Sequence, residues 1–127
     1  MPVAPVEDIV RAICTDKWDG QRLSPSLFKG KSTFVGRLAI TSLAARWDVF
    51  RMFVEKPPER ILELIGEINV GTLQEIGRSH REAPLELTVE PDPLDGFPSH
   101  AVIPQNISRG LANRILAALI IQRPQSD

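Results

Sequence analysis

A short proline-rich segment, residues 91–98, sets the strongest limit on how this chain can fold. Its eight positions hold three prolines, two aspartates and a glycine: Pro91, Asp92, Pro93, Asp95, Gly96 and Pro98. Proline has no N–H group to donate to a β-ladder, and Asp and Gly favour turn geometry. A strand that reaches this segment must therefore end there, and we expect a polar turn between two separate elements.

The residues on either side of this turn predict a β-hairpin. Before it, Leu85, Leu87 and Val89 alternate with polar residues, which is the period of a half-buried strand. After it, the apolar run at residues 100–103 is short and is closed by Pro104, so we expect a second strand. The connection is short enough for the two strands to pair.

A helix is expected to follow the second strand. Asn106 or Ser108 can accept a hydrogen bond from a free N–H group at its beginning. Apolar side chains then recur at the spacing of one helix face, at Leu111, Ile115, Ala118 and Leu119. This C-terminal helix should pack that face on a sheet.

Two further helices are predicted in the first half of the chain. Residues 5–14 begin with a proline and two acidic residues, which suit the first turn of a helix. Their apolar stripe would be Val6, Ile9, Val10 and Ile13. Residues 43–55 carry the clearer stripe, with Leu43, Trp47, Phe50 and Val54 on one face. We expect Trp47 and Phe50 in the core.

Strands are predicted at residues 34–40 and 61–70. The second segment is ambiguous, because its apolar residues fit either period: Ile61, Leu64, Ile65 and Ile68 a helix, or Leu64, Gly66, Ile68 and Val70 a strand. We favour the strand, since an internal glycine and two preceding prolines disfavour a helix, and Gly66 would mark a bulge or a close approach. A short helical turn at 73–78, capped by Thr72, and a solvated loop at 79–82 should follow.

The order of these elements predicts an α+β fold. We expect a two-layer sandwich in which a mixed sheet of about four strands is covered on one face by helices, including the C-terminal helix. With 127 residues and no visible linker, residues 1–127 should form a single domain.

Composition argues against several classes of function. Fifteen Lys and Arg against 16 Asp and Glu give a net charge of −1, so a nucleic-acid partner is not expected. Cys14 is the only cysteine, which rules out an intramolecular disulfide and a thiolate-rich zinc site, and we expect it to be a buried structural thiol. The two histidines lack the spacing of metal ligands. We therefore expect no metal and no cofactor.

The sequence also lacks signals for membrane insertion or secretion. No apolar run approaches the roughly 20 residues that cross a bilayer. The N-terminus has no basic segment followed by an apolar one. We expect no membrane partner and a cytoplasmic location.

The tripeptide Gly30-Lys31-Ser32 matches the end of a phosphate-binding P-loop. That motif needs a glycine five residues earlier, where this chain has Pro25, and a helix afterwards, where we expect a strand. We interpret the segment as a polar loop whose two lysines, Lys29 and Lys31, are solvated.

His100 is the best candidate for a catalytic base, because histidine can accept a proton near neutral pH. The sequence shows no carboxylate that would orient its ring, although Asp92 and Asp95 lie close to it along the chain. The alternative, which we favour, is that His100 opens a strand and hydrogen-bonds the proline-rich turn. The other histidine, His80, is expected to be exposed in a charged loop.

The first third of the chain is the expected binding region. Its loop at residues 22–31 is long for so small a chain, and long ordered loops are often functional. The candidate binding residues are one aromatic residue and four cations: Trp18, Arg22, Lys29, Lys31 and Arg37. Trp18 would either pack beneath the loop or form an exposed anchor at an interface.

These observations support one leading hypothesis of function and two rivals. The leading hypothesis is a small, non-catalytic cytoplasmic binding or accessory module that acts through a protein partner or by self-association. The main rival is a metal-independent hydrolase or transferase on a phosphorylated or nucleotide substrate, with His100 as base and Arg22, Lys29 or Lys31 binding the anion. An RNA-binding sheet is the weakest reading, because no Tyr and only five Phe are present for base stacking.

Overall fold

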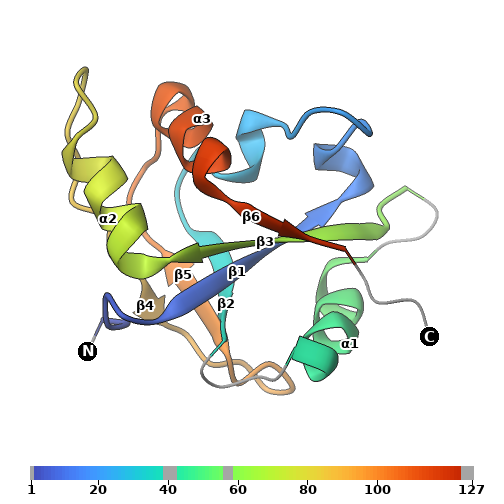
Figure 1. The fold of residues 1–127 in the computed structure, drawn as a ribbon. Helices are drawn as coiled ribbons and strands as arrows, with labels where there is room; N and C mark the ends of the chain where they lie inside the picture. The colour runs from blue at the N-terminus through green and yellow to red at the C-terminus, as the bar shows by residue number, and fades with distance from the viewer. Residues whose placement is uncertain (1, 39–42, 56–58, 124–127) are drawn as a thin grey trace.

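The computed structural model describes residues 2–38, 43–55 and 59–123. They form six strands, three α-helices and two short 3₁₀ turns (Figure 1). The strands are β1 (Asp8–Cys14), β2 (Thr33–Arg37), β3 (Leu62–Asn69), β4 (Glu90–Pro91), β5 (His100–Ile103) and β6 (Ile120–Gln122). The α-helices are α1 (Leu43–Val54), α2 (Val70–Arg78) and α3 (Arg109–Ala118), and the 3₁₀ turns are η1 (Thr15–Lys17) and η2 (Pro25–Leu27).

All six strands belong to one open sheet in the order β4-β5-β2-β1-β3-β6. Every neighbouring pair is antiparallel. The predicted α+β class is therefore confirmed, whereas the expected mixed sheet of about four strands is wrong. The strand count differs because the sequence analysis assigned β1 to a helix and did not find β6.

Strand β1 lies at the centre of the sheet, where a helix was predicted. It pairs with β3 along its whole length and with β2 at its beginning. Ile9, Val10 and Ile13 are all at most 1% exposed, because both faces of the strand are covered. A strand that is buried on both faces is nearly continuously apolar, and such a run contains helical spacings by chance. That coincidence accounts for the wrong prediction.

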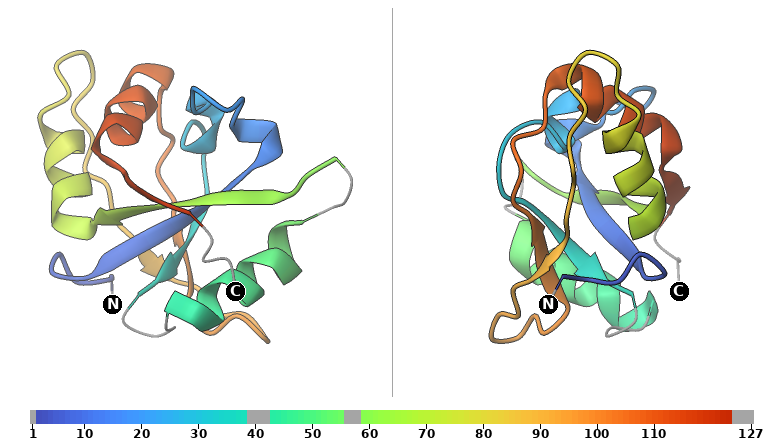
Figure 2. Two further views of the ribbon diagram at one scale, coloured as in Figure 1. Left: turned by 45° about the vertical axis from the view of Figure 1, so that its right-hand side comes forward. Right: turned by 90° about the vertical axis from the view of Figure 1, so that its left-hand side faces the viewer.

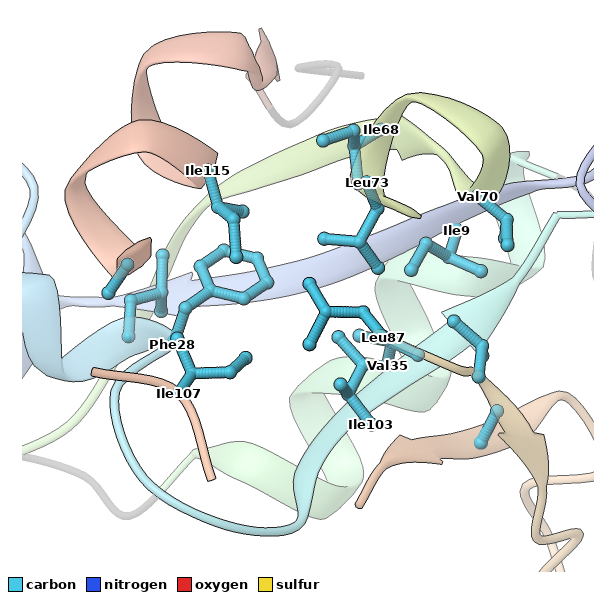
Figure 3. Packing of buried hydrophobic residues seen from close by; sticks show 14 of the residues in the cluster. Ile9, Phe28, Val35, Ile68, Val70, Leu73, Leu87, Ile103, Ile107 and Ile115 are labelled. Atoms are coloured by element: carbon cyan, nitrogen blue, oxygen red, sulfur yellow. The ribbon is translucent and has the colours of Figure 1, made fainter. Parts of the chain in front are cut away.

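Helices cover both faces of this sheet. Helices α2 and α3 lie on one face with η2, and α1 lies on the other (Figures 1 and 2). We call the two hydrophobic clusters the first core, which includes Ile9, Phe28, Leu73 and Ile115, and the second core, which includes Val10, Phe50, Ile65 and Phe97. Figure 3 shows the first core, where side chains from β1, β2, α2 and α3 meet. The predicted arrangement with helices on one face only is therefore wrong.

The segment before the proline-rich turn has the predicted burial but little of the predicted pairing. Leu87 and Val89 are fully buried, yet only Glu90–Pro91 pairs with β5. The extended backbone before β4 is satisfied by other partners: Thr88 N–H donates to Gln105 Oε1 (3.0 Å), and Gln74 Nε2 donates to the carbonyl of Leu87 (3.1 Å). The alternation of apolar and polar residues therefore predicted a buried extended segment, but most of this segment does not pair with another strand.

The ambiguous segment at residues 61–70 contains β3, so the favoured prediction of a strand is confirmed. Gly66 is a site of close approach, because a Cβ atom there would lie 2.9 Å from Leu119 Cδ1. The helix that follows begins earlier than expected, at Val70. Its cap is Asn69, whose Oδ1 accepts the N–H of Thr72 at 3.1 Å, so the predicted cap at Thr72 is wrong.

The C-terminal helix α3 begins as predicted and is followed by an unpredicted strand. Ser108 Oγ accepts the N–H of Leu111 at 3.2 Å, which settles the choice between the two candidate caps. After Ala118 the chain becomes extended and forms β6, which pairs with β3 and is one edge of the sheet (Figure 1). Within the described residues no helix is long and apolar enough to cross a membrane.

The second core offers a direct test of the fold. Trp47 in α1 is 6% exposed, as predicted, and its replacement by alanine should lower the free energy of unfolding by roughly 3–5 kcal/mol. Met52 in the same helix is 77% exposed, so Met52→Ala is the matched control and should change stability by less than about 0.5 kcal/mol. Urea denaturation of both variants measures the difference. Equal losses would contradict the burial of α1.

Candidate functional site

The structure does not bring the five candidate binding residues together. Trp18 and Arg22 lie close together and line one groove. Lys29 and Lys31 are exposed between η2 and β2. Arg37 lies at the end of β2, where it forms an ion pair. The predicted basic binding region is therefore divided among separate places on the chain.

Arg37 is held by Glu7 in a two-pronged ion pair. Arg37 Nη2 lies 2.8 Å from Glu7 Oε2, and Arg37 Nε lies 3.0 Å from Oε1. This hydrogen-bonded guanidinium lowers the pKa of the Glu7 carboxyl below its ordinary value. Because both side chains are partly buried and their charges cancel, Arg37 stabilises the packing of β2 on the N-terminal segment and is not available to bind an external anion.

The groove that contains Trp18 is formed by four parts of the chain, and we call it the Trp18 groove. Its volume is about 480 Å³. Its apolar lining comes from the loop after η1, from β3, from α3 and from β6: Trp18, Leu23, Leu64, Leu116, Ala117 and Ile121. Its polar lining is Gln21, Arg22 and Arg123. Among the described residues, two cations and no carboxylate therefore line this apolar groove.

A tight turn places Trp18 on the wall of this groove. Asp19 Oδ1 accepts the N–H groups of Gln21 (2.8 Å) and Arg22 (2.6 Å), and Gly20 supplies the left-handed backbone, with φ of 97°. These hydrogen bonds lower the pKa of the Asp19 carboxyl. The turn brings Leu23 back against Trp18 as an isolated β-bridge. Trp18 is thus half-buried against the first core and still lines the groove.

Strand β6 borders the same groove and has an open edge. It is the last strand of the sheet, and no strand of the described residues pairs with its outer side. Ile120 is 62% exposed and Ile121 is 42% exposed, which is unusual for isoleucine in a sheet. An edge strand of this kind offers unpaired N–H and C=O groups to another extended chain.

A second cavity lies near the end of β1, and the sequence analysis missed it. We call it the Arg11 cavity; its volume is about 100 Å³. Its charged or polar lining residues are Arg11, Cys14, Asp16, Lys17 and Arg60. The sequence did hold one signal, because Arg11 is a cation inside the apolar run from Ile9 to Cys14.

The shape of the sheet explains how β1 accommodates Arg11. The ladder between β1 and β2 ends at Val10, so the two strands leave room beside Arg11. Arg11 Nε donates to the carbonyl of Leu27 at 3.1 Å, and Cζ lies 4.5 Å from the centre of the Phe34 ring. Burial lowers the pKa of the Arg11 guanidinium to about 10, and the positive charge of Arg60 acts in the same direction. At neutral pH the group is still charged.

Cys14 lines the Arg11 cavity as a buried thiol. Burial, supported by the negative charge of Asp16, raises the pKa of this thiol to about 11. The thiolate is the nucleophilic form, so at neutral pH the residue is a small apolar side chain rather than a nucleophile. This geometry agrees with burial of Cys14, although on a strand and not on the predicted helix.

His100 is fixed by the proline-rich turn and by two aromatic rings. Its Nδ1 lies 2.9 Å from the carbonyl oxygen of Asp92 and 3.3 Å from the Asp92 carboxylate. Because a carbonyl can only accept, Nδ1 carries the proton. The imidazole stacks on Phe34 (5.7 Å between ring centres) and meets Phe97 edge to face (5.3 Å). His100 is absent from the linings of the Trp18 groove and the Arg11 cavity.

His80 is buried, so its predicted exposure is wrong. It is 7% exposed and lies beside Gly110 at the beginning of α3, where a Cβ atom would be 3.5 Å from His80 Cε1. Arg114 of the same helix reaches back and donates to Ser79 Oγ at 3.0 Å. The loop at residues 79–82 is therefore packed against α3, and its charged composition concealed that contact from the sequence analysis.

The remaining motifs do not form a phosphate or metal site in this geometry. Gly30 pairs with Ile107 in an isolated bridge, and β2 begins at Thr33, so no helix follows Gly30-Lys31-Ser32 as a P-loop requires. Within residues 2–38, 43–55 and 59–123, no group of three or more His, Cys, Asp or Glu side chains is placed to hold a metal ion.

No family model, no curated protein and no solved structure matches this chain.

The raised pKa of Cys14 predicts slow reaction with thiol reagents. At pH 8 the folded protein should react with iodoacetamide at least about 100-fold more slowly than a free cysteine of pKa about 8.5, and the rate should rise about tenfold per pH unit up to pH 10. The same chain unfolded in guanidinium chloride is the control and should react at the ordinary rate. A folded protein that reacts as fast as the control at pH 8 would contradict the burial.

The contacts of His100 predict a structural effect of its removal. His100→Ala should lower the free energy of unfolding by about 0.5–1.5 kcal/mol, because it removes the hydrogen bond to an exposed carbonyl of the turn. His100→Asn keeps an N–H donor near the position of Nδ1 and should restore part of the loss. Asp95→Ala, at an exposed position of the same turn, is the control. An unchanged melting curve together with the loss of a phosphoester or nucleotide activity would support the catalytic alternative instead.

Proposed function

We propose that this chain is a non-catalytic binding module that holds an extended, acidic segment of a partner protein in the Trp18 groove. The observation that carries the proposal is the position of this groove beside the open edge of β6. An extended segment laid along β6 can form backbone hydrogen bonds with the strand while its side chains enter the groove. This is the mode of recognition known as β-strand addition.

The apolar lining supports a peptide as the occupant. A segment paired with β6 directs alternate side chains toward the groove side of the sheet. There they would meet Leu23, Leu116 and the half-buried ring of Trp18. Tryptophan is enriched among the residues that dominate binding energy at protein interfaces. The volume of about 480 Å³ is enough for several side chains.

The charge of the groove supports an acidic partner. Arg22 and Arg123 line it from distant parts of the chain, and within the part of the chain that the structure describes no carboxylate lines it with them. Arginine binds carboxylates through two parallel hydrogen bonds, which adds specificity as well as energy. A glutamate or aspartate in the bound segment would complement both arginines.

The geometry gives less support to the hydrolase or transferase. His100 has one feature of an oriented base, because Asp92 holds Nδ1 and leaves Nε2 as the acceptor. However, its ring lies between Phe34 and Phe97, and the candidate anion-binding residues Arg22, Lys29 and Lys31 are not among its contacts within the described part of the chain. The predicted cytoplasmic location stays a prediction.

Selection of peptides tests the proposed function. Linear peptides selected from a random displayed library on the immobilised full chain should contain an acidic residue flanked by alternating apolar residues. Binding of a synthetic selected peptide, measured by calorimetry, should weaken at least about tenfold in the double variant Arg22→Glu, Arg123→Glu. Arg109→Glu, which reverses an exposed charge on α3 outside the groove, is the matched control and should bind like the parent chain.

Equal binding by the double variant and the parent chain would place the peptide elsewhere. Analytical ultracentrifugation of the chain alone tests whether a second copy of the chain occupies the groove instead of a partner peptide. A concentration-dependent dimer that the double variant abolishes would identify the second copy as the ligand.

A further inference from the structure

Arg60, which lines the Arg11 cavity, has a buried side-chain nitrogen without a hydrogen-bond partner among the described residues. Arg60 Nε is shielded from solvent, and within the described part of the chain nothing accepts its proton. Arg60 lies just before β3 and lines the cavity with Arg11. Buried donors are nearly always paired in folded proteins, because an unpaired one costs its full desolvation energy. An unpaired donor on a charged group therefore indicates a site for an acceptor.

Arg11 is held in position for the same acceptor. Its Nε donates to Leu27, and its guanidinium packs on Phe34, so two contacts from different elements fix it. Among the described residues, its other N–H groups have no hydrogen-bond partner. Fixing a guanidinium in advance lowers the loss of side-chain entropy on binding an anion.

The carboxylates near this cavity offset the charge of its arginines only in part. Asp16 Oδ2 lies 4.0 Å from Lys17 Nζ, and its negative charge also favours the charged form of Arg11. Glu55 is close enough to affect Cys14 but does not line the cavity, and its Oε2 accepts the N–H of Leu62 at 2.8 Å. Among the described residues, the lining has three cations against one carboxylate. This balance favours a bound anion.

The size of the cavity limits the ligand. A volume of about 100 Å³ is well below the roughly 300–1,000 Å³ of sites that bind drug-sized ligands. It admits a single oxyanion group and excludes a nucleotide. Its apolar wall, which includes Phe34 and Val54, strengthens charge–charge interactions by excluding water.

From this geometry we propose that the Arg11 cavity binds a small oxyanion, either free or as the terminal group of a small metabolite, through Arg11 and Arg60. This site is independent of the Trp18 groove, since the two linings share no residue. It also places the neutral thiol of Cys14, which lines the same cavity, beside the anion.

NMR of the ¹⁵N-labelled full chain tests the site directly. Addition of sodium phosphate, at ionic strength matched with sodium chloride, should shift the side-chain Nε–Hε signals of Arg60 and Arg11 in a saturable way. Arg60→Gln should weaken phosphate binding at least about tenfold, because one charge-assisted hydrogen bond contributes about that factor or more. Arg109→Gln removes an exposed cation away from the cavity and should bind as the parent chain does.

Cys14 provides a second readout that needs no variant. Because it lines the cavity and is the only cysteine, phosphate should slow its reaction with iodoacetamide at pH 9.5, whereas chloride at equal ionic strength should not. This measurement keeps the proposal testable if Arg60→Gln fails to fold. Arg60→Lys, which keeps the charge and loses the planar fork, should give intermediate affinity.

Three ligands distinguish the sources of the oxyanion. Saturation by phosphate and by glycerol phosphate would assign a terminal phosphate group, saturation by phosphate alone would assign the free ion, and saturation by acetate alone would assign a carboxylate. Each supports an oxyanion site. No saturable shift with any of them, or equal binding by the parent chain and Arg60→Gln, would overturn the proposal.

Discussion

The pairing of β1 between β2 and β3 is the interaction on which the rest of this structure depends. Strand β1 supplies side chains to both cores, because Ile9 and Ile13 face α2 and α3 while Val10 and Ala12 face α1. The two helical layers are therefore connected through one strand. The same strand explains the charged cavity, since its ladder with β2 ends at Val10 and the next residue is Arg11. A polar site arises where the central strand loses one of its neighbours.

The sequence predicted correctly those elements whose apolar residues and helix or strand breakers are all explained by local structure. Helix α1 has one buried face, and its stripe includes Trp47, Phe50 and Val54, all buried. Strand β5 is short but is bounded by prolines that end it on both sides. In both cases local spacing and local breakers agree, so no distant residue is needed to choose between helix and strand.

The errors occur where distant contacts decide the structure. Strand β1 is apolar on both faces, so its pattern does not distinguish a buried strand from a helix. Strand β6 has three residues, too few to show any period, and it forms because β3 offers it an edge. The segment before β4 alternates like a strand, yet Gln74 and Gln105 satisfy its backbone. None of these partners is near in sequence.

The candidate sites also depend on contacts between residues that are distant in sequence, and the sequence alone does not predict these contacts. Trp18 and Arg22 could be found together because one turn connects them. The other wall of their groove comes from Leu116, Ile121 and Arg123, near the far end of the chain. Arg37 appeared to be a free cation because its partner Glu7 is 30 residues away. Arg60 gains its significance from Arg11 and from the absence of a partner for Nε within the described residues, which spacing cannot reveal.

Hydrogen exchange at the two edges of the sheet tests the central claim about function most directly. With a saturating selected peptide, the amides of residues 120–123 should exchange at least about tenfold more slowly, because an added strand would bond the open edge of β6. The amide of Glu90, at the opposite edge, should not change. Protection that is absent at β6, or equal at both edges, would contradict binding by strand addition beside the Trp18 groove.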